Sequence, residues 1–572
     1  MGAICGILGK CDTSVVDAMA RALSHRGPLI HRTQGQNYAL ASSMPVASTC
    51  ALDGQLRAGN AWLAAQDLHD RCQRVQAAAE LGVRGAFAAV VGFRDGGHWW
   101  LLRDRLGRKS LYYYTGKDFL LFASELRALL ASGLVNRRLN LTSIDLYLTF
   151  RCVPAPETLL LGVHRVRPGH VLHYDSMRTW QEPFARFAYE EGWKRDRDEL
   201  TPMIRERLRT ALARHRNGLL LWSSGLDCAA LAALSEDAFQ PVFVVLERSW
   251  QDEARLAKES AKRLRLPLRI VQARRFTEET FWQAARCLDE PIADASVFPL
   301  WLVFEGASHF GASAVTGHGA DELLGGYPRY HLLQKAHGAE GLVPVNQLMG
   351  LLPALPPNAF VRRAGRYLAT IRDPARAFLG LLSVFDQEER EELYTDAMRS
   401  AVYEQNESLG LVREHFLGPD LTRNLLSLDL AVTIPSLLLF ACDHISAAHG
   451  MTVSCPYLDD DMVDLALMLA PRARFGVRSK PLLRLAMRGI LPPRVRLRAR
   501  RGFRIPQSGR VVRVIDSVTK EVITPERVDA TGLFKWPYVE QTVESASHNV
   551  CRRRQFWALL MFFAWYREMM ES

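Results

Sequence analysis

Residues 219–228 read Leu-Leu-Leu-Trp-Ser-Ser-Gly-Leu-Asp-Cys, and the rest of the chain is organised around this stretch. An apolar run, then small residues, then a carboxylate ahead of an Ala/Leu-rich segment predict a buried strand, a tight loop and the start of a helix. Backbone N–H groups in such a loop favour an anion, and Asp227 beside them could hold Mg²⁺ against bound phosphates. The Gly-Lys-Ser/Thr ending of a Walker A loop is missing, and a plain strand-to-helix connection remains the alternative interpretation.

Strand-like and helix-like segments alternate on both sides of this stretch. Helices are expected at Met203–Ala213 and Asp252–Leu264, and strands at 218–222, Pro241–Leu246, Pro267–Val271 and Ser313–Thr316. Such alternation predicts a doubly wound parallel sheet, in which ligands bind at the carboxyl ends of the strands. The small residues after Leu221 lie at such an end.

The chain before about residue 180 has a different pattern. Short apolar runs separated by Gly/Asp turns predict packed antiparallel sheets; they are Phe87–Phe93, Trp99–Leu102, Leu111–Tyr114 and Phe119–Ala123. Residues 181–198 resemble a charged linker, and residues 330–500 are expected to be mainly helical, with a Pro-interrupted piece at Leu352–Pro357. We therefore predict an α/β protein of two domains, 1–182 and 199–572.

Composition narrows the class of protein. The 572 residues are 48% hydrophobic and 23% charged, as in ordinary soluble proteins, and the net charge of +11 favours anionic ligands or an acidic partner. No nucleic-acid recognition motif is present, so no nucleic acid is expected as a partner. The ten cysteines show no CxxC or Cys/His cluster, which predicts neither a zinc site nor a disulfide framework. Without a signal peptide or a membrane-spanning apolar stretch, a cytoplasmic protein without a membrane partner is expected.

Four further stretches place polar residues where chemistry could occur. They are 288–291 (Leu-Asp-Glu-Pro, followed by Asp294 and Ser296), the Gly-rich segment 316–327, 456–459 (Pro-Tyr-Leu-Asp) and 479–484 (Ser-Lys-Pro-Leu-Leu-Arg), which precedes a basic strip at 494–504. Singly, each has a structural interpretation: Asp321 as a helix cap, Lys480 as a solvated lysine, the arginines as a solvated helix face.

Taken together and in this order, these stretches resemble the synthetase half of the asparagine synthetase superfamily. That family carries a Ser-Gly-Gly-x-Asp-Ser loop, an Asp-Glu-Pro segment, a Gly-Glu-Gly-x-Asp-Glu-x-x-x-Gly-Tyr motif, Pro-Phe-Leu-Asp, Lys-x-x-x-Arg and a final Arg-x-Lys-x-Gly-Phe, which Arg498, Arg500, Gly502 and Phe503 match here. The N-terminal part is similar as well, at 25–28, 103–109 and 122–125. The resemblance implies a glutaminase-like Ntn-hydrolase sandwich followed by a parallel sheet of the ATP-pyrophosphatase type with extra helices.

The resemblance implies that ATP activates a carboxylate as an acyl-adenylate, that pyrophosphate leaves and that an amine attacks. The implied nucleotide-binding residues are Leu221, Ser223, Ser224, Gly225, Asp227, Cys228 and Gly317. Asp227 and Asp321 would hold Mg²⁺, and Lys480 would stabilise charge on pyrophosphate and the developing intermediate. A leaving pyrophosphate needs a dication and fixed donors more than a nucleophile, so this residue set suits the reaction. Cys228, which replaces a Ser, is expected to be structural.

The N-terminal half departs from a working glutaminase. The family's nucleophile is a Cys whose own α-amine is the base, whereas Cys5 here lies behind Gly2, Ala3 and Ile4. Met44 stands in place of the Arg that binds the glutamine carboxylate, and Asp53-Gly54-Gln55 replaces Asn-Gly-Glu. The resemblance therefore implies a scaffold without glutaminase activity.

The amine must then come from another source. Relatives that lost the glutaminase include β-lactam synthetases and lasso peptide cyclases, in which an amine of the same molecule closes the ring. His318 stands where asparagine synthetases have Glu, and Thr452 and Ser454 stand where they have Glu and Arg. His318 could accept the amine proton, or it could be a structural imidazole.

We therefore expect a lasso peptide cyclase, which forms a macrolactam between the N-terminal amine and an Asp or Glu side chain of a precursor (core) peptide. A leader peptidase and a leader-recognition protein would be its partners. The alternatives are a β-lactam synthetase-like or ammonia-dependent amide ligase and, from another class, an inactive scaffold for peptide maturation. The retained Asp227, Asp321 and Lys480 argue against the scaffold.

Overall fold

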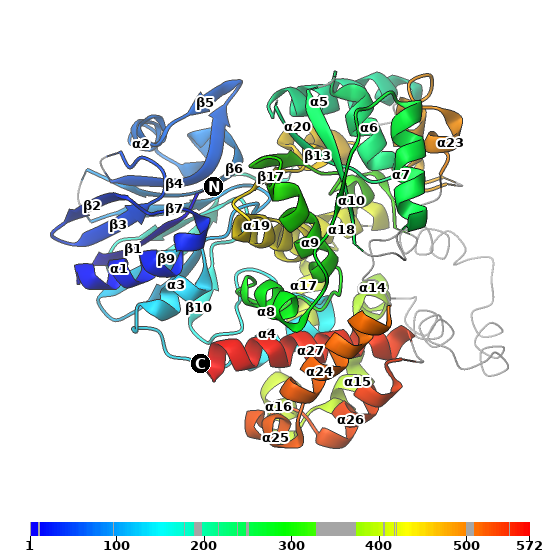
Figure 1. The fold of residues 1–572 in the computed structure, drawn as a ribbon. Helices are drawn as coiled ribbons and strands as arrows, with labels where there is room; N and C mark the ends of the chain where they lie inside the picture. Colours follow the sequence, from blue (N-terminus) through cyan, green and yellow to red (C-terminus); the bar gives the residue numbers. More distant parts are fainter. Residues whose placement is uncertain are drawn as a thin grey trace.

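Two antiparallel sheets form the N-terminal half of the chain (Figure 1). The first has the order β10 (Val163–Arg165), β8 (Tyr112–Thr115), β9 (Phe119–Ala123), β1 (Ile4–Gly9), β3 (Tyr38–Ser42), β2 (His31–Gly35). The second has the order β12 (Thr179–Pro183), β11 (His170–Tyr174), β7 (Trp99–Arg103), β6 (Val83–Gly92), β4 (Cys50–Ala58), β5 (Ala61–Leu63). The four apolar runs of the sequence are β6 to β9, so the predicted antiparallel sheets are confirmed.

The computed structural model describes residues 2–571 except 10–11, 48, 95–96, 177, 188–196, 216, 237, 247–250, 328–372, 404–406, 417, 419, 477, 499–507 and 548–549. The predicted piece Leu352–Pro357 and the end of the basic strip, with Arg500, Gly502 and Phe503, lie outside the described residues. Most of the predicted linker does so too, and the domain boundaries at 182 and 199 stay predictions.

Strand β1 shows how the N-terminal sheets are packed. Successive side chains of a strand point to opposite faces, so Ile4 and Leu8 enter the core between the two sheets. Cys5 and Ile7 point the other way and pack in the core that includes α1 (Thr13–Ala22). Cys5 therefore faces away from the space between the sheets.

A parallel sheet forms the centre of the C-terminal half. Its order is β15 (Arg269–Gln272), β14 (Phe239–Val245), β13 (Gly218–Leu221), β16 (Ser313–Val315), β17 (Thr452–Ser454). The chain starts at β13, moves outward to β14 and β15, and then returns to the other side of β13. The strand order therefore reverses between β13 and β16, which is where open α/β sheets bind ligands.

Both faces of this sheet are covered, as a doubly wound fold requires. Leu220 and Val315 pack with α5 (Arg197–Ala213) and α6 (Leu226–Leu234), whereas Leu219 and Ala314 pack with α9 (Val297–Ser308) on the opposite face. The remaining helices before the long gap are α2 (Ala65–Cys72), α3 (Leu126–Ala131), α4 (Leu141–Phe150), α7 (Gln251–Arg263), α8 (Glu278–Arg286) and α10 (Ala320–Leu324). The predicted fold class is confirmed.

Strand β17 was not predicted. The sequence indicates a mainly helical region between 330 and 500, but Thr452–Ser454 adds a parallel strand beside β16, with Val315 opposite Ser454. Three residues between a helix and a proline are too short for a periodic signal, so only their pairing with β16 defines the strand.

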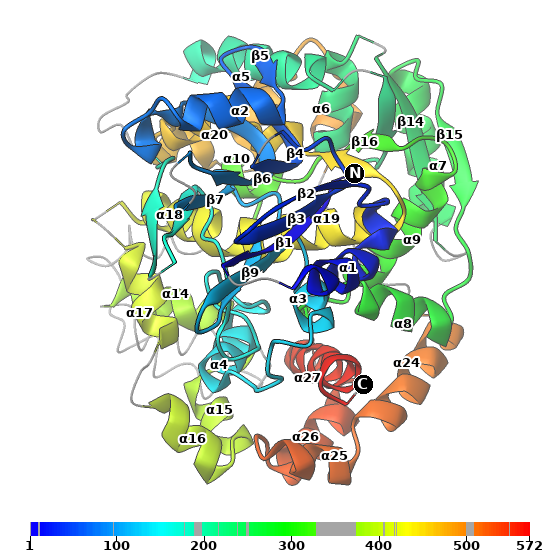
Figure 2. The same ribbon diagram turned by 90° about the vertical axis from the view of Figure 1, so that its left-hand side faces the viewer.

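Helices form the rest of the C-terminal half. They are α14 (Pro374–Leu382), α15 (Gln387–Leu393), α16 (Asp396–Tyr403), α17 (Glu407–Glu414), α20 (Asp460–Leu467), α21 (Pro471–Arg474), α22 (Pro481–Ala486), α23 (Pro493–Arg496), α24 (Gly509–Val522), α25 (Pro525–Thr531), α26 (Trp536–Ser545) and α27 (Val550–Met570). Figure 2 shows α27 with α24, α25 and α26 gathered around it, below the N-terminal sheets. Its side chains from Phe556 to Trp565 are buried in the main core.

One continuous helical segment, Leu421–Ala448, is long and apolar enough to cross a membrane by length and composition. It comprises α18 (Leu421–Leu428), a π-helical stretch (Asp429–Leu438) and α19 (Leu439–Ala448). Its apolar window is 72% buried inside the protein, which is the environment of a core helix.

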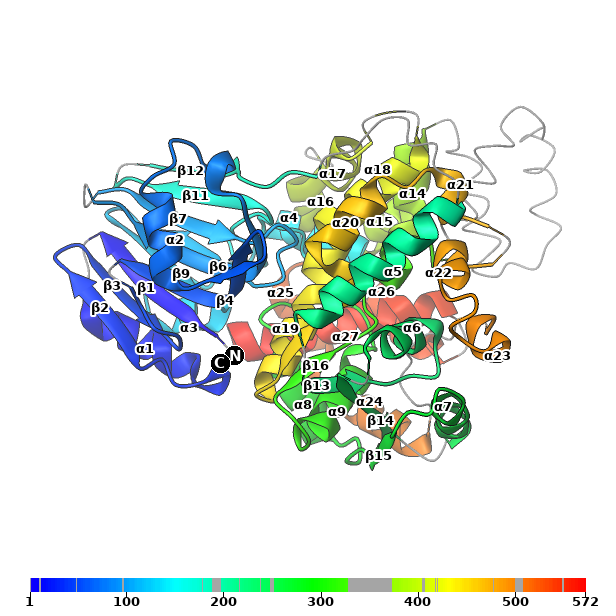
Figure 3. The ribbon, with the colours of Figure 1, turned by 90° about the horizontal axis from the view of Figure 1, so that it is seen from above.

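The two halves meet along α19 and α20, where the ends of β4 and β6 approach the C-terminal helices (Figure 3). Arg57 and Arg84 of these strands bind Asp461 at the start of α20. Lys109 binds Asp443 of α19 at 2.7 Å. Charged side chains from both halves therefore hold the halves together.

Candidate functional site

The loop after β13 contains Ser223, Ser224 and Gly225, ahead of Asp227 on α6. Gly225 caps α6, and its N–H donates to Ser223 Oγ at 3.2 Å. The thiol of Cys228 donates to the carbonyl of Leu221 at 3.3 Å, and Cys228 is buried. The side chain of Cys228 thus bonds back to the end of β13, while the backbone of the loop lies at the start of a helix. The roles predicted for Cys228 stay predictions.

The loop after β16 lies against the first one. A Cβ on Gly317 would come within 2.9 Å of Asp227 Cβ, and a Cβ on Gly319 would collide with Leu458. Gly319 also adopts φ +91°, a left-handed conformation that favours glycine. These glycines let the backbone pass beside Asp227 and turn sharply into α10, which carries Asp321.

Lys480 joins the two loops. Its Nζ lies 2.7 and 2.6 Å from the two carboxylate oxygens of Asp227 and 2.8 Å from Asp321 Oδ1. The structure thus brings together the three residues expected to carry the reaction, from three different elements. Lys480 is only 4% exposed, so the alternative of a solvated surface lysine is wrong.

The charges in this cluster reinforce one another. Burial disfavours the ammonium of Lys480, but the carboxylates of Asp227 and Asp321 outweigh burial and raise the pKa of Lys480. Lys480 therefore stays positively charged at neutral pH. The two carboxylates share one cationic partner, and paired carboxylate oxygens are the ligands that Mg²⁺ prefers, so Asp227 and Asp321 fit a metal at this position.

Two neighbouring residues support the cluster. Tyr457 donates its hydroxyl to the carbonyl of Asp227 at 3.0 Å, and Tyr327 donates to Glu322 at 2.6 Å. Asp459 caps α20 by accepting from the N–H of Asp461. In the Pro-Tyr-Leu-Asp stretch, therefore, Tyr457 contacts the site while Asp459 has the structural role of a helix cap.

Ser224 has partners that tie the basic strip to the loop. Its hydroxyl donates to Glu253 at 3.0 Å, and Arg498 donates to its carbonyl at 3.1 Å. Glu253 was not singled out in the sequence, because a glutamate in an amphipathic helix carries no local signal of a distant partner. Arg498 was singled out only through the family motif.

The Asp-Glu-Pro stretch lies elsewhere. Asp289 accepts from the backbone N–H of Leu126 at 2.7 Å and contacts His444 at 3.3 Å. Glu290 pairs with Arg165 of the N-terminal half at 3.4 Å. Both carboxylates are buried between the halves, so this stretch holds the halves together and does not join the Lys480 cluster.

His318 faces two cysteines. Ligand atoms of His318, Cys442 and Cys455 all lie within 4.8 Å of one another. Burial opposes a charged imidazole, but the nearby thiol of Cys455 outweighs it and raises the pKa of His318. In turn Cys442, and after it His318, lower the pKa of Cys455 well below its usual range. The two interpretations of His318, as proton acceptor and as structural imidazole, both stay predictions.

The residues that depart from the glutaminase pattern are largely buried. Cys5 is fully buried, and burial raises the pKa of its thiol to about 12. Asp53 is also buried, accepting a hydrogen bond from Ser124 Oγ at 3.0 Å. The N–H of Met44 donates to Ser42. A buried thiol with such a pKa is a poor nucleophile at neutral pH.

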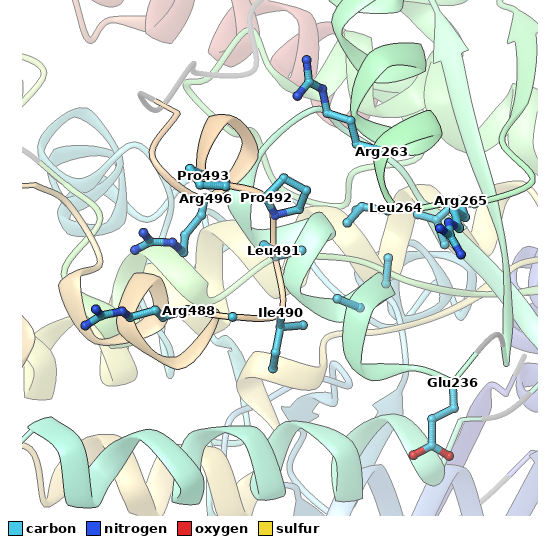
Figure 4. Close-up of a pocket in the computed structure, with 14 residues that line it drawn as sticks. Glu236, Arg263, Leu264, Arg265, Arg488, Ile490, Leu491, Pro492, Pro493 and Arg496 are labelled. Carbon is cyan, nitrogen blue, oxygen red and sulfur yellow. The ribbon is translucent and has the colours of Figure 1, made fainter.

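A cavity of about 820 Å³ lies apart from these residues, between the end of α6, the end of α7 and segment 488–496 (Figure 4). Arg263, Arg265, Arg488 and Arg496 line it, and their side chains point in different directions and do not converge on one point. No predicted site residue lines this cavity. Arginines spread in this way do not form a compact anion site.

Comparison with known families gives two matches. Residues 200–567 match the asparagine synthase family, and residues 73–185 match a glutamine amidotransferase domain. The second match begins after Cys5, Met44 and Asp53, the positions that depart from a working glutaminase.

Individual proteins show the same likeness at low identity. Asparagine synthetase [glutamine-hydrolyzing] 1 of Bacillus subtilis is 23% identical over 526 residues, covering 87% of this chain and 79% of that protein. A putative asparagine synthetase [glutamine-hydrolyzing] of Mycobacterium bovis is 25% identical over 524 residues, covering 85% and 76%. Among solved structures, glutamine phosphoribosylpyrophosphate amidotransferase from B. subtilis aligns at 13% identity with a TM-score of 0.22, covering 48% of this chain and 67% of that one. At that score the last likeness carries no structural argument.

Proposed function

Because this chain belongs to the asparagine synthase family, whose members are ATP-dependent amide-forming ligases, we propose that it is a lasso peptide cyclase. In this proposal it adenylates an Asp or Glu side chain of a core peptide with ATP and Mg²⁺, and the peptide's N-terminal amine then closes a macrolactam. AMP and pyrophosphate are released.

One contrast carries the proposal: the synthetase cluster is complete while the glutaminase nucleophile is buried. Lys480 contacts both Asp227 and Asp321, whereas Cys5 is 0% exposed. An amide ligase without its own ammonia source needs an amine from elsewhere. An amine on the activated molecule itself makes that step intramolecular, which lowers its entropic cost.

The proposed roles follow from position. The backbone N–H groups around Ser223, Ser224 and Gly225 would bind the phosphates at the start of α6. Asp227 and Asp321 would hold Mg²⁺, which neutralises charge on the leaving pyrophosphate. Lys480, charged and fixed by both carboxylates, would stabilise negative charge beside them.

His318 would accept the proton that the attacking amine loses. It lies on the loop after β16, three residues beyond the strand end, at the same carboxyl edge as Asp227. Its pairing with Cys455 makes proton uptake a property of the pair and not of the imidazole alone.

The charge of the chain bears on the substrate and partners that we propose. A net charge of +11 would favour an acidic precursor peptide, and a leader peptidase and a leader-recognition protein would deliver it. A β-lactam synthetase-like or ammonia-dependent ligase would use the same Lys480 cluster with another acceptor.

The test is to incubate the purified chain with ATP, Mg²⁺ and the linear core peptides encoded beside its gene. We expect pyrophosphate release and a product lighter by one water, without glutamine. Asp321→Asn should remove both signals, and the matched exposed carboxylate variant Asp396→Asn should keep them.

Other outcomes distinguish the alternatives. Pyrophosphate release only with added ammonium would indicate an ammonia-dependent ligase. A β-lactam product from a small β-amino acid would indicate the other ring-forming class. The absence of pyrophosphate release with every substrate, from a folded chain, would contradict the proposal and favour a scaffold.

A further inference from the structure

We propose that His318, Cys442 and Cys455 bind a zinc ion beside the nucleotide loops. The ligand atoms of these three side chains lie within 4.8 Å of one another. The inference goes beyond the proposed function, because zinc binding does not depend on which carboxylate is activated.

The three residues come from three elements that meet at the carboxyl edge of the parallel sheet. His318 lies in the loop after β16, and Cys455 directly follows β17. Cys442 is on α19, which packs against β17. Thr316 N–H donates to the carbonyl of Ser454 at 3.0 Å, so the two strand ends are fixed side by side.

The donor set is that of a zinc site. Zinc prefers thiolate and imidazole ligands at about 2.3 and 2.1 Å, in tetrahedral geometry, and catalytic sites use three protein ligands with one open position. A separation of at most 4.8 Å needs only a modest approach of the side chains around such an ion. Two thiolates balance the charge of one Zn²⁺, so the ion and its three protein ligands would together carry no net charge.

Burial and hydrogen bonding at these three side chains suit a metal site. Nδ1 of His318 is buried and has no hydrogen-bond partner in the part of the chain that the structure describes. Cys442 is buried, whereas Cys455 and His318 are half-buried. Three protein ligands would leave one position of a tetrahedral zinc ion for a fourth ligand from solvent or substrate.

The carboxylates near this cluster are already paired with cationic side chains, so they do not compete with the cysteines for zinc. Asp443, next to Cys442, is held by Lys109 at 2.7 Å and by Arg26 at 3.0 Å. Asp321 is held by Lys480. The hard carboxylates of the adenylation cluster and the soft thiolates of the zinc site are therefore separate donor sets, suited to Mg²⁺ and to Zn²⁺.

Zinc would change the role of His318. As a zinc ligand, the imidazole would not be free to accept the amine proton. Zinc binding and the base role of His318 would therefore exclude each other.

The experiment measures metal content in the full chain. The protein is incubated with Zn²⁺ under a non-chelating reductant, dialysed and analysed by elemental mass spectrometry. We expect close to one zinc per chain, and a fall of at least about tenfold in Cys442→Ser, Cys455→Ser and His318→Ala. The control variant Cys72→Ser should keep the zinc, because Cys72 is a buried cysteine on α2 that is not one of the three proposed ligands.

Cobalt provides a measurement that needs no variant. Co²⁺ added to the zinc-free wild-type chain should give a thiolate-to-metal charge-transfer absorption, which added Zn²⁺ removes. Wild-type protein without zinc and without this absorption would overturn the proposal. Zinc that survives all three ligand substitutions would overturn it as well.

Discussion

Lys480 combines three unusual properties in a single residue. It is almost fully buried, it is charged, and it adopts φ +54°, the left-handed region that costs a non-glycine residue about 1 kcal/mol. Its backbone N–H donates to the carbonyl of Gly325, which holds the strained turn beside α10. The strain is offset because this backbone directs the ammonium between Asp227 and Asp321.

Replacing Lys480 by Met should remove catalysis without removing the fold. The variant leaves two carboxylates without their shared cation, and loss of one such electrostatic group costs about 10²- to 10³-fold in kcat. Pyrophosphate release is the measurement. Lys262→Met, on the exposed side of α7, is the matched control and should keep turnover within about twofold. Equal losses in both variants would contradict the role assigned to Lys480.

Cys5 should have no catalytic role. Cys5→Ala should leave ATP-dependent turnover within about twofold, because the thiol is fully buried, with its pKa raised to about 12. Glutamate release from glutamine should stay at background in the wild type and in the variant. Glutamate release that the wild type shows and Cys5→Ala loses would refute this prediction.

At the scale of elements, two loops and one helix start form the cluster of Asp227, Asp321 and Lys480. The loops follow β13 and β16, neighbouring strands on either side of the point where the order reverses, and α22 brings Lys480 across them. Gly326, after α10, makes this approach possible. A Cβ there would collide with the carboxylate of Asp321 and come within 2.6 Å of Lys480 Cε.

Gly326→Ala should therefore reduce turnover by about 10²-fold, because displacing a catalytic group by roughly 1 Å has that effect. The melting temperature should change little in comparison. Gly380→Ala is the control: it lies in α14 with open space around the added methyl and should stabilise the helix by about 1 kcal/mol. Unchanged turnover in Gly326→Ala would show that Asp321 and Lys480 can move apart without loss of function.

At the scale of the whole molecule, charged side chains join the N-terminal half to the C-terminal half. The stretches of the N-terminal half that resemble the family make contacts with the C-terminal half. Arg26 binds Glu125 and Asp443, and Arg108 donates to the carbonyl of Leu458, next to Tyr457. The N-terminal half thus contacts elements next to the Lys480 cluster.

Asp461 provides a test of this interface. It binds Arg214 at 2.7 Å, Arg84 at 2.8 Å and Arg57 at 3.3 Å. Burial opposes its charge, but these arginines, Arg214 first, outweigh burial and lower the pKa of Asp461 from its ordinary value of 3.8. A carboxyl with a lowered folded-state pKa contributes stability above its unfolded pKa and loses it as pH falls.

Asp461→Asn should therefore lower the free energy of unfolding by about 1 to 2 kcal/mol at pH 7, a value reduced for its partial exposure. The difference from the wild type should shrink as pH falls below about 4. Thermal unfolding at several pH values measures it. Asp175→Asn, in the exposed pair with Arg178, should change stability by less than about 0.5 kcal/mol at any pH.

The sequence by itself determined the fold class and much of the cluster around Lys480. Strand periodicity located β6 to β9 and the strands up to β16, and motif order marked Asp227, Asp321 and Lys480. These signals are local: a strand alternates along its own length, and a loop after a strand must be small to turn.

Only the tertiary structure decided which distant side chains meet. Cys442 and Cys455 are separated along the chain from each other and from His318, so no spacing rule joins them. Strand β17 exists only through pairing, and Asp289 and Glu290 were marked by sequence but lie in the interface between the halves. The reason is physical: such contacts depend on how helices and sheets pack, and packing is not encoded in the spacing of any single segment.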